Sequence, residues 1–176
     1  MKKSLRLITA GCLATFLLLV AGFASAQTNM DEFMIKWDHS KQYTLDVLAQ
    51  MPDAGMDDKP DAEAMSFKEQ IHHIANSIAG LSQRFLNGTE PDFAIDIATC
   101  SKVELADFVA KSYDYGAKSI KAISPEQAEE KLDVFGNKAS RRQVMALLMD
   151  HSSHHVGSAV VYLRLQGVKP PAYVGF

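Results

Sequence analysis

Closely spaced histidines are the residues of this sequence whose type and spacing could do chemistry. His151 and His155 lie four residues apart, with His154 between them. On a helix, residues i and i+4 lie one above the other on one face, so the two rings can converge on one metal ion. The alternative is a pair of buried histidines that form hydrogen bonds with other helices. A divalent metal on neutral imidazoles lowers the pKa of a bound water or thiol, which gives a nucleophile near neutral pH.

The helix around these histidines has an apolar stripe, and the two rings are predicted to lie in its middle. On a helical wheel of about 100° per residue, with Val144 at zero, Tyr162 also falls at about 0° and Leu148 at about 40°, while Leu147 and Leu165 fall at about 300°. His151 falls at about 340° and His155 at about 20° on the same wheel. An imidazole in an apolar interior is costly unless its nitrogens have partners, and a metal ion would supply them.

A catalytic metal usually takes three protein ligands and keeps an open position, so a third ligand is expected. The candidates are His72 and His73, and helical periodicity does not decide between them. No glutamate stands between His151 and His155, which removes the main support for a zincin-type metalloprotease. Imidazole ligands suit zinc, nickel, iron or copper, so the ligand type does not choose among them. We expect zinc or nickel, with iron as a further option. His39 is predicted to be solvated.

The elements that must position these residues are marked by capping boxes, in which a serine is followed three residues later by Glu or Gln. The four boxes are Ser66–Glu69, Ser101–Glu104, Ser124–Gln127 and Ser140–Gln143. With the apolar periodicity they predict long helices at about 31–51, 67–86, 102–123 and 141–166, and a short one after Ser124. No strand is predicted, and residues 132–137 are expected to be irregular. These elements predict an all-α, up-down four-helix bundle.

The first 26 residues are predicted to be a cleavable signal peptide. Lys2, Lys3 and Arg6 precede an apolar run, and Ala24-Ser25-Ala26 has the small-residue pattern that signal peptidase cleaves. The alternative is an uncleaved membrane anchor, for which the apolar run is short. The domain then covers residues 27–176, and we expect an exported protein, periplasmic or secreted, without membrane contact after cleavage.

Composition and cysteine content exclude several classes of protein. The 176 residues are 47% hydrophobic and 22% charged, which excludes a disordered or low-complexity chain. The formal net charge of -3 gives no polybasic surface for a nucleic-acid partner. Cys100 is the only cysteine of residues 27–176, so no disulfide can form there. It is predicted to be a small buried hydrophobe rather than a nucleophile.

Three segments resemble motifs of the DinB-like (DinB/YfiT) superfamily. Residues 65–75, MSFKEQIHHIA, resemble its second-helix motif. Residues 150–158, DHSSHHVGS, resemble its H-x-x-H-H-R-G-Q signature, and residues 162–171 resemble the tail that follows. The resemblance covers essentially the whole domain. It implies a four-helix bundle with a three-histidine metal site that faces the bundle interior.

The resemblance also implies which histidines are the ligands. By its His-Ile-Ala register, His73 matches the ligand of the second helix, and His151 and His155 match the two ligands of the last helix. The residues expected around these ligands, where they could support them or assist protonation, are His72, His154, Ser158 and Tyr162. Two positions depart from the signature, because Val156 replaces its Arg and Ser158 its Gln. Hydrogen bonding that the Gln supplies in relatives must then come from Ser158 or be missing.

Three classes of function follow from these expectations. The first is a metal-dependent enzyme, either a hydrolase or a thiol transferase, whose general base cannot be named. The better-understood members of the family resemble cytosolic thiol transferases that use a low-molecular-weight thiol, a co-substrate less assured outside the cytosol. The second class is a metal-binding or ligand-binding bundle without turnover, and the third is a structural bundle whose histidines are satisfied core groups.

The expected partner is a small-molecule substrate or a thiol, bound in a pocket at the bundle interior. Trp37 or Tyr43 is predicted to border that pocket, although aromatic residues there are more often part of the core. Pairing of two copies through a helical face is an expectation by analogy with other helical bundles.

Overall fold

The structure is a computed structural model, and it describes residues 30–175. The predicted signal peptide, residues 1–26, lies outside the described residues. The chain divides into two compact units, Met1–Ile35 and Lys36–Phe176. The described part of the first unit, residues 30–35, is helical. Within residues 30–175, no helix combines the length and the hydrophobicity that a membrane span requires.

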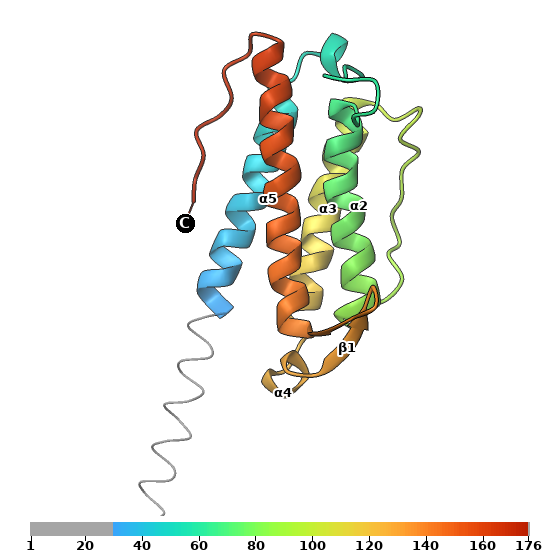
Figure 1. The fold of residues 1–176 in the computed structure, drawn as a ribbon, viewed down its shortest axis with the longest axis vertical. Helices are drawn as coiled ribbons and strands as arrows, with labels where there is room; N and C mark the ends of the chain where they lie inside the picture. The colour runs from blue at the N-terminus through green and yellow to red at the C-terminus, as the bar shows by residue number, and fades with distance from the viewer. Residues whose placement is uncertain (1–29, 176) are drawn as a thin grey trace, which may run out of the picture. The chain divides into compact units, whose positions relative to one another are not determined.

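Long helices make up most of the second unit (Figure 1). A helix over residues 30–50 continues into it and is followed by a short 3-10 helix, η1 (Asp53–Gly55). The later helices are α2 (Phe67–Phe85), α3 (Lys102–Lys121), the short α4 (Pro125–Ala128) and α5 (Arg141–Leu165). The chain is therefore mostly helical, as predicted, and each predicted end of α2, α3 and α5 lies within two residues of the observed one.

All four predicted capping boxes are present. At the start of α2, the Ser66 hydroxyl accepts a hydrogen bond from the Glu69 backbone N–H, at 3.2 Å. The Glu69 carboxylate accepts one from the Ser66 N–H in return, at 2.6 Å. Because two otherwise unpaired donors are satisfied in this way, the helix begins at a defined residue. The start of α2 in turn fixes where His72 and His73 point.

The segment between α4 and α5 is a β-hairpin, so the prediction that it is irregular and that the chain has no strand is wrong. The strands β1 (Lys131–Val134) and β2 (Asn137–Ser140) pair antiparallel. The turn residues Phe135 and Gly136 both have positive φ, of 53° and 82°, as a two-residue hairpin turn requires. A phenylalanine in that position gives no turn signal in the sequence, which is why the hairpin was not predicted.

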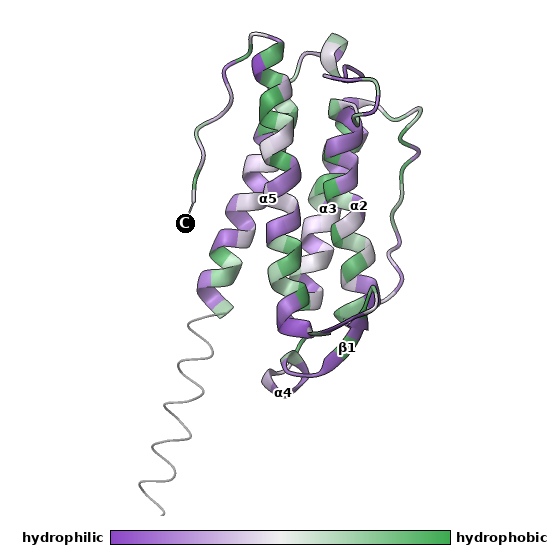
Figure 2. Cartoon of the chain, in the orientation of Figure 1, coloured by the Kyte–Doolittle hydropathy of each residue, from purple (hydrophilic) through white to green (hydrophobic). Residues whose placement is uncertain are grey.

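The helices pack through their apolar faces, and α2 contacts both α3 and α5. Residues 36–50 pack against α3, where Trp37 and Tyr113 are 1% and 0% exposed. Hydrophobic and hydrophilic residues alternate around the helices, whereas the hairpin is mainly hydrophilic (Figure 2). This arrangement buries one side of each helix and leaves the contact between α2 and α5 as the place where the histidines meet.

The buried face of α5 matches the predicted one in part, since Val144, Leu148 and Tyr162 are buried as predicted. Leu147 and Leu165, which the helical wheel placed on the apolar stripe, are 38% and 64% exposed. The buried residues are Val144, Met145, Leu148, Met149, Ser152, Val156, Ala159, Val160, Tyr162 and Leu163. Since α5 is apolar on more than one side, the predicted stripe extends beyond the side that is buried. His151 and His155 consequently lie at the margin of the buried face, half-buried, and not in its middle.

Candidate metal centre

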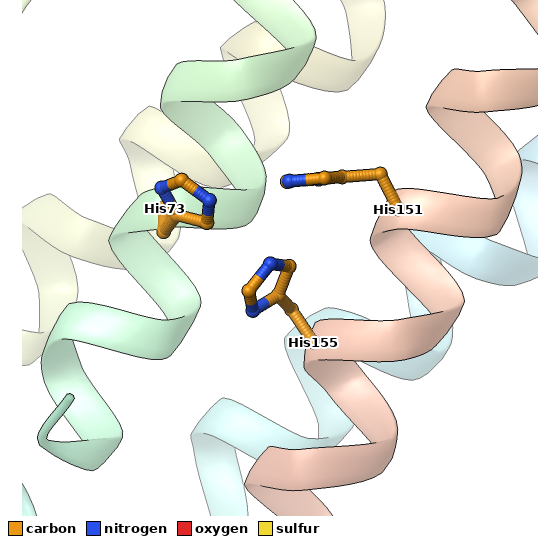
Figure 3. Close-up of side chains that lie close together, drawn as sticks. All are labelled: His73, His151 and His155. Atoms are coloured by element: carbon orange, nitrogen blue, oxygen red, sulfur yellow. The ribbon is translucent and has the colours of Figure 1, made fainter. Parts of the chain in front are cut away.

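His73, His151 and His155 form a compact cluster between two helices (Figure 3). His73 projects from α2 and the other two rings project from α5. The ring centroids of His73 lie 4.9 Å from His151 and 4.5 Å from His155, and those of the α5 pair lie 4.5 Å apart. One ring nitrogen of each histidine lies within 4.8 Å of the others. The structure therefore brings together the three histidines that the resemblance implied as ligands.

Local sequence explains why these rings meet at the margin of the core. Ile71 and Ile74 on α2 are both fully buried, at 0% exposed, and set the inward direction of that helix. His73 lies between them in sequence and so points to the side of the buried face, toward α5. On α5 the four-residue spacing stacks His151 and His155 on one flank. The cluster is half-buried, which keeps one side of it accessible to a ligand.

A glutamine on α2 orients one ring of the cluster. The Oε1 atom of Gln70 lies 2.7 Å from Nδ1 of His155. A side-chain amide oxygen can only accept, so Nδ1–H of His155 donates to it and the lone pair lies on Nε2. This arrangement is typical of metal-binding histidines, whose second nitrogen is usually held by a hydrogen bond. Gln70 is not among the predicted site residues, although its position three residues before His73 places both on one side of α2.

Burial favours the neutral form of the two α5 rings, His151 and His155. Desolvation, and next the neighbouring rings of His151, His73 and His154, lower the pKa of His155 to about 4. Desolvation followed by the His73 and His154 rings also lowers the pKa of His151. Because only the neutral imidazole has a lone pair to give, a lowered pKa favours the metal-binding form.

The cluster fits a divalent transition metal. Imidazole nitrogens bind zinc at about 2.0–2.1 Å, and rotation of half-exposed side chains can bring nitrogens within 4.8 Å of one another to that range. Three neutral ligands of one type leave open positions on the ion. The donor set suits zinc, nickel or iron and does not select among them.

Of the other residues predicted near the ligands, His72 and His154 make ring contacts, whereas Ser158 bonds to its own helix. His72 stacks on Phe108 of α3, with ring centroids 5.4 Å apart, and burial lowers its pKa. The exposed His154 places its ring 4.9 Å from that of His155. In contrast, the Ser158 hydroxyl donates to the backbone of His154 at 3.2 Å, so it does not replace the glutamine of the family signature at the rings.

Tyr162 was predicted to support the ligands or assist protonation, but its hydroxyl is bonded to the protein backbone. Its ring is 5% exposed, and its hydroxyl donates to the backbone oxygen of Met65. Tyr162 thus ties the segment before α2 to α5. Since Met65 lines a pocket beside His73, this hydrogen bond positions a wall of that pocket.

The pocket beside His73 has a volume of about 380 Å³, and neither Trp37 nor Tyr43, which were predicted to border a pocket, lines this one. It is lined by Lys59, Glu63, Ala64, Met65, Glu69, His72, His73 and Ile97. Trp37 instead belongs to the core, and Tyr43 packs edge-on against Tyr173, with centroids 5.4 Å apart. Both rings pack against another aromatic ring, in line with the expectation that aromatic residues here are more often part of the core.

Two further sequence predictions are modified by the structure. His39 is half-buried rather than solvated, and its Nδ1 is shielded from solvent. Cys100 is half-buried, with its sulfur 3.8 Å from the backbone oxygen of Ile97. Desolvation raises the pKa of the Cys100 thiol, which disfavours the nucleophilic thiolate.

The mostly helical fold and the cluster of three histidines between two helices indicate the class of protein to which this chain belongs. The DinB family profile matches residues 25–175, so the chain belongs to the DinB family. Uncharacterized protein YjoA of Bacillus subtilis (strain 168) is 28% identical over 113 residues, which cover 62% of this chain and 72% of that protein.

Two crystal structures resemble the fold. One is a DinB-like protein from Bacillus subtilis, YjoA, with a TM-score of 0.68 and 18% identity over 82% of this chain and 99% of that one. The other is a DinB-like protein from Bacillus cereus ATCC 10987, with a TM-score of 0.68 and 17% identity over 82% and 97% of the two chains. At these identities the likeness shows the shared fold alone.

Proposed function

We propose that this protein binds a divalent transition metal through His73, His151 and His155 and uses it to transform a small molecule. The observation that carries the proposal is the convergence of three half-buried ring nitrogens, within 4.8 Å of one another, from two helices. When bound, such a metal lowers the pKa of a water or thiol, which supplies a nucleophile near neutral pH. The reaction class is accordingly hydrolysis or thiol transfer.

The residues of the chain have separate tasks in this proposal. Gln70 holds the His155 ring in one tautomer and orientation through the hydrogen bond at Nδ1. The lowered pKa values of His151 and His155 keep both rings neutral and available. The outer positions of the cluster remain accessible because all three rings are only half-buried.

The pocket beside His73 is the proposed binding site for the substrate. Met65 and Ile97 give it apolar walls, while Glu63, Glu69 and Lys59 give it charged ones. The Lys59 ammonium lies 3.4 Å from the Glu69 carboxylate, so these two charges largely offset each other. A small molecule with an apolar body and one polar group fits this lining.

The test is a substrate screen on metal-loaded protein that covers ester hydrolysis and thiol conjugation to electrophiles. We expect turnover that depends on the loaded metal and disappears in the variant His151→Ala/His155→Ala. A His39→Ala variant is the matched control, because it removes a histidine outside the cluster. Turnover that survives the loss of both cluster histidines would contradict the proposal.

A second candidate function is metal binding without turnover. The observation that favours it is where the side chains lie at the two positions that depart from the family signature, Val156 and Ser158. Val156 is 6% exposed and belongs to the core, and the Ser158 hydroxyl is bonded to its own helix. Neither offers a group to a substrate. Stoichiometric metal binding with no turnover across esters and thiols would select this candidate.

We further propose that the protein is exported, after cleavage between Ala26 and Gln27. The support is the order of basic, apolar and small residues in the first 26 positions. The mass of the intact protein recovered from its native compartment tests this, since a chain that starts at Gln27 is expected. Recovery of the uncleaved chain would contradict it.

A further inference from the structure

The outward side of α5 has almost no charge. Between Arg142 and Arg164, Asp150 is the only Asp, Glu, Lys or Arg. The exposed side of α3 is quite different, since it carries Glu104, Asp107, Lys111, Asp114, Lys118 and Lys121. Charged side chains of both signs are typical of a helix face in water. The face of α5 therefore has the composition of a surface that contacts protein.

Seven exposed residues of α5 form a continuous stripe, which we call the outer face of α5. Its members are Leu147, Asp150, His154, Gly157, Val161, Arg164 and Leu165. Three of these are large hydrophobic residues, with Leu147, Val161 and Leu165 38%, 50% and 64% exposed. Gly157 lies near the centre, and a Cβ atom there would meet nothing within 4 Å. The glycine thus leaves open space on the outer side that another helix can approach closely.

We propose that the outer face of α5 packs antiparallel against the same face of a second copy, with a two-fold axis that passes near Gly157. The charges support this occupant and this register. Asp150 precedes Gly157 by seven residues and Arg164 follows it by seven. At about 1.5 Å per residue both lie about 10 Å from the axis, so each Asp150 meets the partner's Arg164. A parallel pairing would place like charges together.

The exposed apolar residues of the two copies also lie opposite one another in this antiparallel arrangement. Leu147 lies ten residues before Gly157 and Leu165 eight residues after it. In an antiparallel pair, Leu147 and the Leu165 of the second copy are therefore offset by only two residues, or about 3 Å along the helix axis. His154, three residues before the centre, faces the partner's Val161 in the same way. One two-fold arrangement thus pairs the exposed hydrophobic residues and both charges, as a symmetric dimer interface requires.

The proposed interface borders the histidine cluster. His154 belongs to the outer face of α5, and its ring contacts that of His155, with centroids 4.9 Å apart. A second copy would therefore cover this flank of the cluster and leave access from the pocket beside His73. The pairing itself does not depend on whether the three histidines hold a metal.

The test is sedimentation equilibrium on the purified protein over a range of micromolar concentrations. We expect the wild type to be a dimer and the single charge reversals Asp150→Arg and Arg164→Asp each to weaken it by about 10- to 100-fold, since each places like charges together twice. The double variant Asp150→Arg/Arg164→Asp is expected to regain most of the wild-type affinity. Lys118→Asp is the matched control, because Lys118 is also an exposed basic residue in the last turn of its helix.

A variant at the centre separates the interface from folding. Gly157→Gln places a long side chain into the outer face, where it blocks the second copy without a clash inside the monomer. Because Gln forms helix better than Gly, we expect the thermal stability of the monomer to be kept or raised while dimerisation is lost. This variant decides the outcome if a charge reversal fails to fold.

Three results would overturn the proposal. They are a wild type that stays monomeric at every concentration, a dimer unchanged by the reversals and by Gly157→Gln, and a double variant that does not recover. The variant His151→Ala/His155→Ala is expected to remain dimeric while it loses metal. Failure of the proposed metal function can therefore be distinguished from failure of the interface.

Discussion

The two sides of the bundle are built differently. Where residues 36–50 meet α3, Trp37 donates from Nε1 to the backbone oxygen of Tyr113 at 3.0 Å, and the Tyr113 hydroxyl lies 3.0 Å from Ser40 Oγ and 3.1 Å from Thr44 Oγ1. Gly116 lets the Trp37 ring approach so closely that a Cβ atom there would lie 2.8 Å from it. Where α2 meets α5, three half-buried histidines stand with nitrogens as far as 4.8 Å apart.

The difference indicates that one side of the bundle contributes mainly to stability and the other mainly to ligand binding. The contact between Trp37 and Tyr113 is closely packed and its polar atoms are satisfied, which is how an interior contributes to stability. The histidine cluster contributes less packing and keeps its nitrogens for a ligand. A substitution on one side should therefore change stability without changing metal binding, and a substitution on the other side should do the reverse.

The largest expected effect is on the metal side. In the variant His151→Ala/His155→Ala, the affinity for zinc or nickel is expected to fall by more than about 100-fold, since the loss of a mere supporting hydrogen bond costs about 10–100-fold. The melting temperature of the metal-free protein should stay close to that of the wild type, because the lost rings are half-buried. Calorimetric titration and thermal melts measure the two quantities. Wild-type metal affinity in this variant would show that His151 and His155 do not hold the metal.

The next effect is on the packed side. Trp37→Ala is expected to lower the free energy of unfolding by about 3–5 kcal/mol, as the loss of a buried aromatic side chain typically does. Metal stoichiometry of the folded protein should not change. Urea unfolding and metal analysis test both parts, with Trp37→Phe as the milder control that keeps an aromatic ring and loses the bond to Tyr113. A loss of metal in folded Trp37→Ala protein would show that the two sides are coupled.

A smaller effect tests the glutamine. Gln70→Leu keeps the size of the side chain but removes the acceptor for His155 Nδ1–H, so metal affinity is expected to fall by about 10–100-fold. Gln70→Glu retains an acceptor and is expected to recover most of the affinity. Equal affinities in Gln70→Leu and the wild type would show that the hydrogen bond does not orient the ring for a ligand.

The smallest expected effect is on the pH dependence of the metal-free protein. Since the pKa of His155 is about 4 in the folded state and about 6.5 in an unfolded chain, the unfolded chain binds the extra proton between these values. Stability from this ring is therefore complete above about pH 6.5 and is lost as the pH falls toward about 4. Solvent screening of the half-exposed ring limits the loss to about 1 kcal/mol. His155→Gln should flatten the melting curve against pH, and an unchanged slope would contradict this cause.

Local signals in the sequence predicted the helices, whereas the faces they bury depend on their neighbours. Each capping box joins a serine to a residue three positions away, so Ser66 and Ser140 mark the helix starts without any knowledge of the fold. The buried side of α5 depends on where α2 packs, and Leu147 is exposed although it is apolar. Because α5 is apolar on several sides, the predicted stripe overlaps the buried face at Val144, Leu148 and Tyr162 but extends beyond it to Leu147 and Leu165.

The candidate site was also predicted only in part, because a pattern within one helix can be read from the sequence and a contact between helices cannot. The spacing of His151 and His155 lies within one helix, and the resemblance supplied His73. The partner of His155, Gln70, lies 85 residues away in sequence. No local pattern joins these two positions, so only the packing of α2 on α5 reveals that the amide oxygen reaches the ring.

The central claim is that one metal ion is shared by His73, His151 and His155. Anomalous diffraction from crystals of the protein, purified without a histidine tag and loaded with zinc or nickel, tests it most directly. One strong anomalous peak is expected at about 2.0–2.1 Å from a nitrogen of each ring. An absence of any peak between α2 and α5 in metal-loaded crystals, or a peak held by other residues, would contradict it.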